Sequence, residues 1–369
     1  MLGSKVKQKI FLLISILIAF IAGCSEQPPT GHDGSGTLVL YSLWDTSSVE
    51  GVQKIVAMDN AKVILVSEYG TIIKYTDQQG RLELSHLPAA TYDISVRKNH
   101  PDDNNIILCG SLRTVKVGYD KTVSDTIYTK PFSSFGISIN EIYSAGPVNN
   151  VFYFFDQFIE LYNSSDEIKY LDGMLIARVS GNSEGKGPGA DEGDDGDIDG
   201  ITYYFKFPGN PGEKNYPFNP HEFIVLASDG VDHRTACATS IDLSKSDWEF
   251  FNQYSPEDVD NKTVKNLINL RSDRTADFLI SLSGDVVVIT TGEDSVYTDG
   301  FDISTVIDGV EYQTSSSPLK TLDSRIDRSY AICPGKYTGK SFQRREPGLD
   351  TNDGLLDWEI LSSPTPGYQ

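Results

Sequence analysis

The sequence predicts an all-β protein, in which two tandem β-sandwiches follow a signal peptide. Short apolar runs, many of them alternating with polar residues, recur from residue 37 onward with turn residues between them. The chain contains 19 Tyr and 17 Phe, and both residue types favour strands. Its 369 residues exceed the length of an average domain, so we expect more than one folded unit.

The first 23 residues have the anatomy of a signal peptide rather than of a membrane span. A basic start is supplied by Lys5, Lys7 and Lys9. The apolar run that follows, residues 10–23, has 14 residues, whereas a spanning helix needs about 20. We therefore expect residues 1–23 to be removed from the mature protein.

The end of this run, Ile21-Ala22-Gly23-Cys24, resembles the lipobox of bacterial lipoproteins, in which Leu is more usual at the place of Ile21. The resemblance implies cleavage before Cys24 and lipid attachment to its sulfur and new amino group. It also implies a lipid-anchored protein of the bacterial outer membrane, at the cell surface or on the periplasmic face. A plain secretory signal with a chance cysteine is the alternative.

The formal net charge is −21, and it becomes −24 once the signal peptide with its three lysines is removed. A charge of this sign and size argues against nucleic acid and anionic lipid surfaces as partners. It is compatible with cation binding, and equally with an acidic, solvated exterior.

Three cysteines follow Cys24, so at most one bridge can form within the folded part. Cys237 and Cys333 both fall in the second half of the chain and could pair, or they could be buried free thiols. No CxxC pair or HExxH motif is present, which argues against a zinc site.

Residues 24–36 carry Pro, Gly and Ser without an apolar period, so we expect a flexible tether. Strand patterns then follow one another to residue 131. We predict the strands of this first domain, residues 37–131, at 38–43, 61–67, 71–76, 81–84, 91–96, 106–108, 111–117 and 122–128.

The stretch from Thr76 to Val96 combines Thr-Asp, a turn glycine, the run RLELSHLP and the strand TYDISV. It resembles the prealbumin-like β-sandwich modules called carboxypeptidase-regulatory-like or Cna B-type, apart from Ala90 where the family usually has Gly. The resemblance implies a stalk or spacer for residues 37–131.

The second domain, residues 132–369, opens with ISINEIY at 137–143 and continues with FIELYNSSD at 158–166. These blocks resemble the lamin-tail domain, an immunoglobulin-like β-sandwich. Later strands are expected at 222–227, 277–282, 284–289 and 306–310, and insertions at 181–200 and 233–275, the second with a short helix. As a whole, the chain resembles an uncharacterised lipoprotein family of gut-type Gram-negative bacteria that pairs the two modules.

The sequence DGDIDG places Asp195, Asp197 and Asp199 at alternate positions before a glycine, which is the first half of a calcium loop. The pattern is incomplete, because Lys206 stands where a full EF-hand loop has Glu. A calcium site is one interpretation and a solvated acidic loop is the other; no other cofactor is expected.

Asn140, Glu141 and Glu160 belong to the blocks that resemble the lamin tail. We expect them to hydrogen-bond loop backbone at one end of the sandwich, with a binding site as the alternative.

No GxSxG, Walker or dinucleotide motif is present, and we expect no enzyme. The function favoured is non-enzymatic binding or adhesion, or an accessory role in transport, with an outer-membrane β-barrel transporter or an extracellular ligand as partner. The alternatives are a purely structural envelope protein and a calcium-dependent hydrolase or nuclease.

Overall fold

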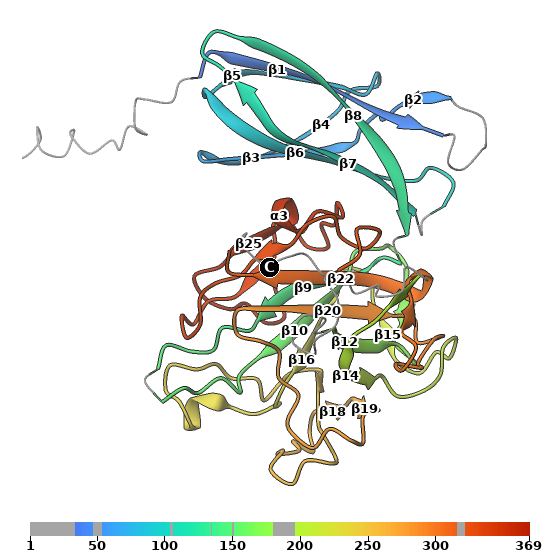
Figure 1. Ribbon diagram of the computed structural model, residues 1–369, viewed down its shortest axis with the longest axis vertical. Helices are drawn as coiled ribbons and strands as arrows, with labels where there is room; N and C mark the ends of the chain where they lie inside the picture. The colour runs from blue at the N-terminus through green and yellow to red at the C-terminus, as the bar shows by residue number, and fades with distance from the viewer. Residues whose placement is uncertain are drawn as a thin grey trace, which may run out of the picture.

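The computed structural model describes residues 34–46, 54–103, 106–133, 135–149, 151–179, 196–315 and 322–369. It confirms an all-β protein with two tandem β-sandwiches, stacked one above the other in Figure 1. In these ranges no helix has the length and apolar character that a membrane crossing requires. Cys24 and Asp195 lie outside the described residues.

The first sandwich contains eight strands, in the order β2-β1-β8-β7-β6-β3-β4, with β5 paired to β1. Leu38, Leu40, Val63, Ile94 and Val96 point inward from the two layers, as the alternation of each strand dictates. The strands are β1 (Gly36–Asp45), β2 (Ile55–Ala57), β3 (Lys62–Ser67), β4 (Gly70–Tyr75), β5 (Arg81–Leu87), β6 (Ala90–Asn99), β7 (Ile106–Val117) and β8 (Thr122–Ser133).

The first sheet of the second sandwich has seven strands in the order β18-β17-β16-β10-β9-β24-β25. The strands are β9 (Ile137–Tyr143), β10 (Phe158–Asn163), β16 (Phe223–Ala227), β17 (Trp248–Glu249), β18 (Lys265–Asn266), β24 (Phe342–Arg344) and β25 (Trp358–Ile360). The helix α3 (Gly354–Asp357) leads into the last of them.

The second sheet has six strands in the order β19-β14-β12-β20-β22-β23. The strands are β12 (Leu175–Val179), β14 (Ile201–Lys206), β19 (Ile268–Asn269), β20 (Gly284–Thr290), β22 (Val306–Gln313) and β23 (Ala331–Ile332). The two sheets bury an aromatic core that includes Phe205, Phe250 and Phe278.

Two small strand pairs and two 3₁₀ helices complete the second domain. The pairs join β11 (Lys169–Tyr170) with β15 (Pro217–Phe218), and β13 (Asp197–Ile198) with β21 (Phe301–Asp302). The 3₁₀ helices are η1 (His233–Thr235) and η2 (Ile303–Thr305).

One expectation for the second domain is wrong. No strand forms at 277–282, because the side chain of Gln157 takes the place of a neighbouring strand: its Oε1 accepts from the backbone N–H of Ile280 and its Nε2 donates to the carbonyl of the same residue. The 233–275 insertion does contain a short helix, the 3₁₀ helix η1, whereas Trp248 lies in a strand that pairs in parallel with β16 while its indole packs edge-on against Phe207.

Polar contacts dock the two sandwiches onto each other. Asp353, which is buried, accepts from the Arg113 guanidinium and from the Ser111 hydroxyl at 3.3 Å. Lys62 pairs with Glu346, and Arg97 donates to the carbonyl of Gly348 at 2.9 Å. These contacts tie the β3-β6-β7 layer of the first sandwich to the segment around α3 (Figure 1).

Replacing Asp353 by Asn is expected to loosen this docking, because it removes the charge that the Arg113 guanidinium faces. The pair is partly exposed on the arginine side, so we expect a loss of about 1–2 kcal/mol. Scanning calorimetry checks it: one cooperative transition should become two. An Asp120→Asn variant, altered in the exposed turn between β7 and β8, is the control. A single transition unchanged in Asp353→Asn would contradict the expectation.

Candidate functional site at the domain junction

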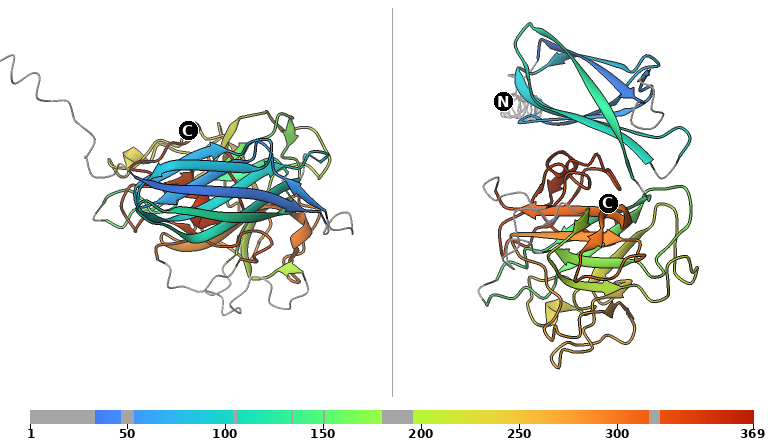
Figure 2. Two further views of the ribbon diagram at one scale, coloured as in Figure 1. Left: turned by 90° about the horizontal axis from the view of Figure 1, so that it is seen from above. Right: turned by 45° about the vertical axis from the view of Figure 1, so that its right-hand side comes forward.

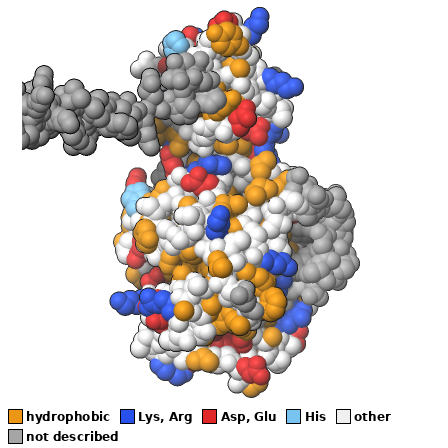
Figure 3. All heavy atoms as spheres, turned by 90° about the vertical axis from the view of Figure 1, so that its left-hand side faces the viewer, with side chains coloured by type: hydrophobic (Ala, Val, Ile, Leu, Met, Phe, Trp, Pro, Cys, Tyr) orange, Lys and Arg blue, Asp and Glu red, His pale blue; other side chains and the backbone are white. Residues whose placement is uncertain are grey.

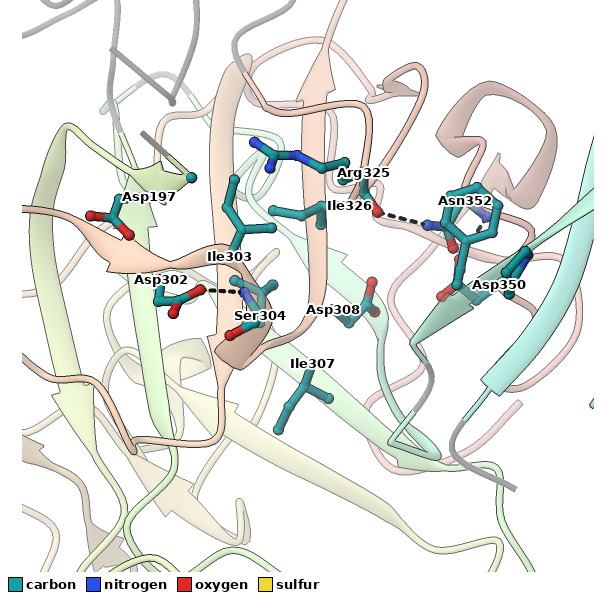
Figure 4. Close-up of a pocket in the computed structure, with 14 residues that line it drawn as sticks. Asp197, Asp302, Ile303, Ser304, Ile307, Asp308, Arg325, Ile326, Asp350 and Asn352 are labelled. Carbon is teal, nitrogen blue, oxygen red and sulfur yellow. Dashed lines mark hydrogen bonds between the residues drawn. The ribbon is translucent and has the colours of Figure 1, made fainter. Parts of the chain in front are cut away.

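A cavity of about 510 Å³ lies at the junction between the first and the second sandwich. One wall is Pro131 and Phe132, the end of β8. The remaining walls come from the second domain, and Figure 4 shows them around the opening. The charged residues of the lining are Asp197, Asp302, Asp308, Asp350 and Arg325.

Asp197 and Asp302 face each other across the β13–β21 pair. Like charges at directly opposite positions of a strand pair are destabilising unless something compensates them. Asp302 accepts from the backbone N–H of Ser304 at 2.7 Å and so caps η2 (Figure 4). Of the predicted calcium-loop residues, Asp197 therefore lies in a strand beside the cavity, and the buried Ile198 separates it from Asp199.

Asp308 belongs to a charged cluster at the back of the cavity, around the fully buried Arg344. The Arg344 guanidinium donates to Asp308 at 2.8 Å and lies 3.5 Å from both Asp350 and Asp357. Burial raises the pKa of Asp308 and of Asp357, and the guanidinium opposes both shifts. Three carboxylates and one cation leave this region acidic.

Asn140, Glu141 and Glu160 bind the end of the chain, which confirms the expectation that they hold loop backbone. Glu141 accepts from the N–H of Thr365 at 3.0 Å and from its hydroxyl at 2.8 Å. Glu160 accepts from the N–H of Gly367 at 2.6 Å and from Asn140 at 3.1 Å. Burial raises the pKa of Glu160 to about 8 and that of Glu141 in the same direction.

A second acidic group, unforeseen from the sequence, surrounds Asp229. Burial and the nearby carboxylates of Asp258, Asp277 and Glu249 raise the pKa of Asp229 to about 7. Asp277 also lines a separate cavity of about 440 Å³. Carboxyl groups that titrate near neutral pH can exchange protons with a bound ligand. Four separate segments supply these side chains, so no local motif marks them.

The cysteines do not form a bridge. Cys109, Cys237 and Cys333 are free thiols, so the pairing of Cys237 with Cys333 that the sequence left open does not occur. Burial raises the pKa of the Cys333 thiol to about 12 and also raises that of Cys109, which keeps both unreactive.

The residues predicted to bind calcium are only partly described. Asp197 lines the junction cavity and Asp199 is two residues further along, while Asp195 falls in a range for which no structure is described. Within the described part of the chain, no three His, Cys, Asp or Glu side chains gather closely enough to hold a metal ion.

One family model matches part of the chain. Residues 219–299 match the model of a family described as a protein of unknown function, DUF4876. This segment spans β16 to the end of β20 and includes the group around Asp229. No curated protein matches the chain.

The fold is similar to that of a solved protein. A DUF4876 family protein from Bacteroides thetaiotaomicron superposes with a TM-score of 0.52 at 20% identity, over 88% of this chain and 94% of that one. At this identity the likeness concerns the fold alone. A "putative carbohydrate binding protein" from Pseudomonas aeruginosa covers 28% of this chain, and 94% of its own, at 17% identity, but its TM-score of 0.22 carries no argument.

Proposed function

We propose that this chain is a lipid-anchored, non-enzymatic binding protein of the bacterial outer membrane, made of a prealbumin-like and a lamin-tail-like sandwich. The junction cavity is its binding site, and its partner is an extracellular ligand or a β-barrel transporter. The observation that carries the binding role is the cavity itself: its walls come from both domains, and ligand sites favour domain interfaces.

The lining indicates the class of ligand. Four aspartates and one arginine give the cavity an excess of negative charge. Asp308 and Asp350 are engaged with Arg344, whereas Asp197 and Asp302 lie directly opposite each other in the β13–β21 pair. The excess of negative charge in the lining suits a ligand that carries a cationic group, or a divalent cation.

Calcium is the cation to test first, because Asp195, Asp197 and Asp199 supply the hard oxygen ligands that it prefers. At about 100-fold excess over its dissociation constant, calcium should raise the free energy of unfolding by about 2.7 kcal/mol. Thermal unfolding with calcium, with magnesium and with EDTA measures the effect. The gain should vanish in Asp197→Asn and persist in Asp120→Asn. Identical thermal unfolding curves with calcium, with magnesium and with EDTA would show that the protein does not bind calcium.

Anchoring is tested by fractionation of cells that express the full chain. The wild type should partition with the outer membrane, and Cys24→Ser should leave it, since the acyl chains attach to that cysteine. Cys237→Ser is the control, because that thiol lies in the folded domain. Membrane association unchanged in Cys24→Ser would count against a lipid anchor.

A further inference from the structure

The loop between β9 and β10 exposes several apolar side chains to solvent. Val148, Val151 and Phe152 are 60%, 73% and 70% exposed. Tyr337 from a distant segment meets Phe152 edge-on, with ring centroids 5.7 Å apart. Isolated exposed apolar residues are ordinary, but a contiguous group of this kind marks an interaction site.

Hydrogen bonds of Asn149 connect the described parts of this loop. The side-chain oxygen of Asn149 accepts from the N–H groups of Val151 and Tyr153, and its nitrogen donates to the carbonyls of Pro147 and Tyr153. Phe152, at φ 59°, lies in the left-handed region that is unfavourable for a bulky side chain. Strain of this kind persists only where the surroundings enforce it, and it often accompanies function.

Two other segments brace the loop from outside. The Tyr153 hydroxyl donates to Nδ1 of His233 at 2.6 Å, and Nε2 of His233 donates to the carbonyl of Asp229 at 3.0 Å. Because a carbonyl only accepts, Nε2 of His233 carries a proton, and burial lowers the pKa of this histidine, which favours the neutral ring with Nδ1 as the acceptor. The Thr239 hydroxyl donates to the carbonyl of Val148 at 2.6 Å, so the exposed side chains stand on a rigid base.

The loop lies at the same end of the molecule as the start of β1. Strands of both sandwiches run across Figure 1, and the beginning of β1 and the β9–β10 connection both lie at the left of that view. The view from above in Figure 2 also places these two segments at the same end. The turn between β7 and β8 lies at the same end, since the backbone N–H of Asp120 donates to the Ser35 hydroxyl. This turn carries Tyr119, which is 70% exposed.

Figure 3 looks directly at this end. It shows apolar side chains gathered over the second domain, with lysine, arginine and acidic side chains around them. Lys336 and Lys340 flank Tyr337 in the sequence and are exposed. Apolar side chains bordered by amphipathic aromatics and lysines suit the boundary between lipid headgroups and acyl chains.

The length of chain between Cys24 and Gly36 indicates that a lipid bilayer is what contacts these exposed side chains. Gly36 lies twelve positions after Cys24, and a fully extended chain of that length spans at most about 40 Å. A lipid on Cys24 therefore keeps a bilayer close to this end of both sandwiches.

We propose that this end is a membrane-contact face, and that Val148, Val151 and Phe152 enter the interface of the bilayer that holds the lipid on Cys24. The proposal rests on the lipid anchoring proposed above. It makes the second sandwich membrane-proximal as well, rather than a domain held away from the membrane by the first. The negative net charge favours a zwitterionic lipid surface for the contact.

Tryptophan fluorescence tests the contact on the lipidated full-length mature protein, reconstituted in phosphatidylcholine vesicles. The three native tryptophans, Trp44, Trp248 and Trp358, are at most 6% exposed, so an added surface tryptophan dominates any response to lipid. Phe152→Trp is the probe. Tyr75→Trp is the matched control, since Tyr75 is 53% exposed at the opposite end of the first sandwich's strands.

In vesicles with brominated acyl chains, the added tryptophan at position 152 should lose about half of its emission and shift to shorter wavelength, and the control should do neither. Equal emission in brominated and plain vesicles for Phe152→Trp would overturn the proposal, as would equal quenching of probe and control. The Cys24→Ser protein, which carries no lipid, should also be concentrated without vesicles. If the emission of the tryptophan at position 152 then shifts to shorter wavelength, the loop contacts a second copy of the protein instead of a membrane. Lipidation itself is read from the mass of the reconstituted protein, so a failed contact is distinguishable from a missing anchor.

Discussion

Arg344→Met is expected to lower the free energy of unfolding of the second sandwich by about 3–5 kcal/mol, the cost of leaving buried carboxylates without their cation. Arg344 is 2% exposed and is the common partner of Asp308, Asp350 and Asp357. It also donates to the carbonyls of Ile139 and Leu349 at 2.8 and 2.7 Å, and Met can do neither.

Urea unfolding followed by tryptophan fluorescence measures this loss, because Trp358 packs beneath the guanidinium. Arg325→Met is the control: that side chain is about half exposed and pairs with Asp323 at the surface, so its loss should be within about 1 kcal/mol. Restoring part of the loss with Asp357→Asn in the Arg344→Met background would identify uncompensated charge as the cause. Equal midpoints for Arg344→Met and wild type would contradict the role given to this cluster.

Glu160 should make the protein less stable as the pH rises. Because burial raises its pKa to about 8, the folded state binds a proton that the unfolded state has released between its ordinary pKa near 4.5 and 8. The contribution is fully present below that ordinary value and is lost as the pH passes through the folded value. Asp229, with its pKa raised to about 7, adds to the same trend.

The free energy of unfolding should therefore fall by on the order of 3 kcal/mol between about pH 5 and pH 9. Glu160→Gln should flatten much of this slope, since Gln stays neutral and can still accept one of the two hydrogen bonds. Denaturant titrations at several pH values compare it with Glu83→Gln, altered at an exposed site of β5. Identical slopes in wild type and Glu160→Gln would show that Glu160 does not titrate in this range.

Local patterns sufficed for most of the first sandwich. Alternation placed Leu38, Leu40, Ile94 and Val96 in its core, because one face of each of these strands meets apolar neighbours. Alternation failed at residues 277–282, where Phe278 and Ile280 are buried as a strand pattern requires but a glutamine side chain replaces the neighbouring strand. The residue that takes the place of the strand, Gln157, lies more than a hundred positions away in the sequence, so a local pattern cannot reveal it.

The candidate site was less accessible to sequence reasoning. The acidic motif led to Asp197, yet its cross-strand partner Asp302 and the wall formed by Phe132 come from other parts of the chain. A signal for the buried cluster was present in Asp308, a charged residue inside the apolar run VIDGV. Its partner Arg344 lies 36 positions later on β24, a strand of the other sheet, so the two meet where the sheets pack together.

The intact mass of the protein extracted from outer membranes tests the central claim, that a lipid-anchored binding protein is displayed there, most directly. The account predicts a chain that begins at Cys24, lacks residues 1–23 and carries the added mass of its acyl chains on that residue. A chain that retains residues 1–23, is cleaved at another bond, or begins at Cys24 without added lipid would contradict it.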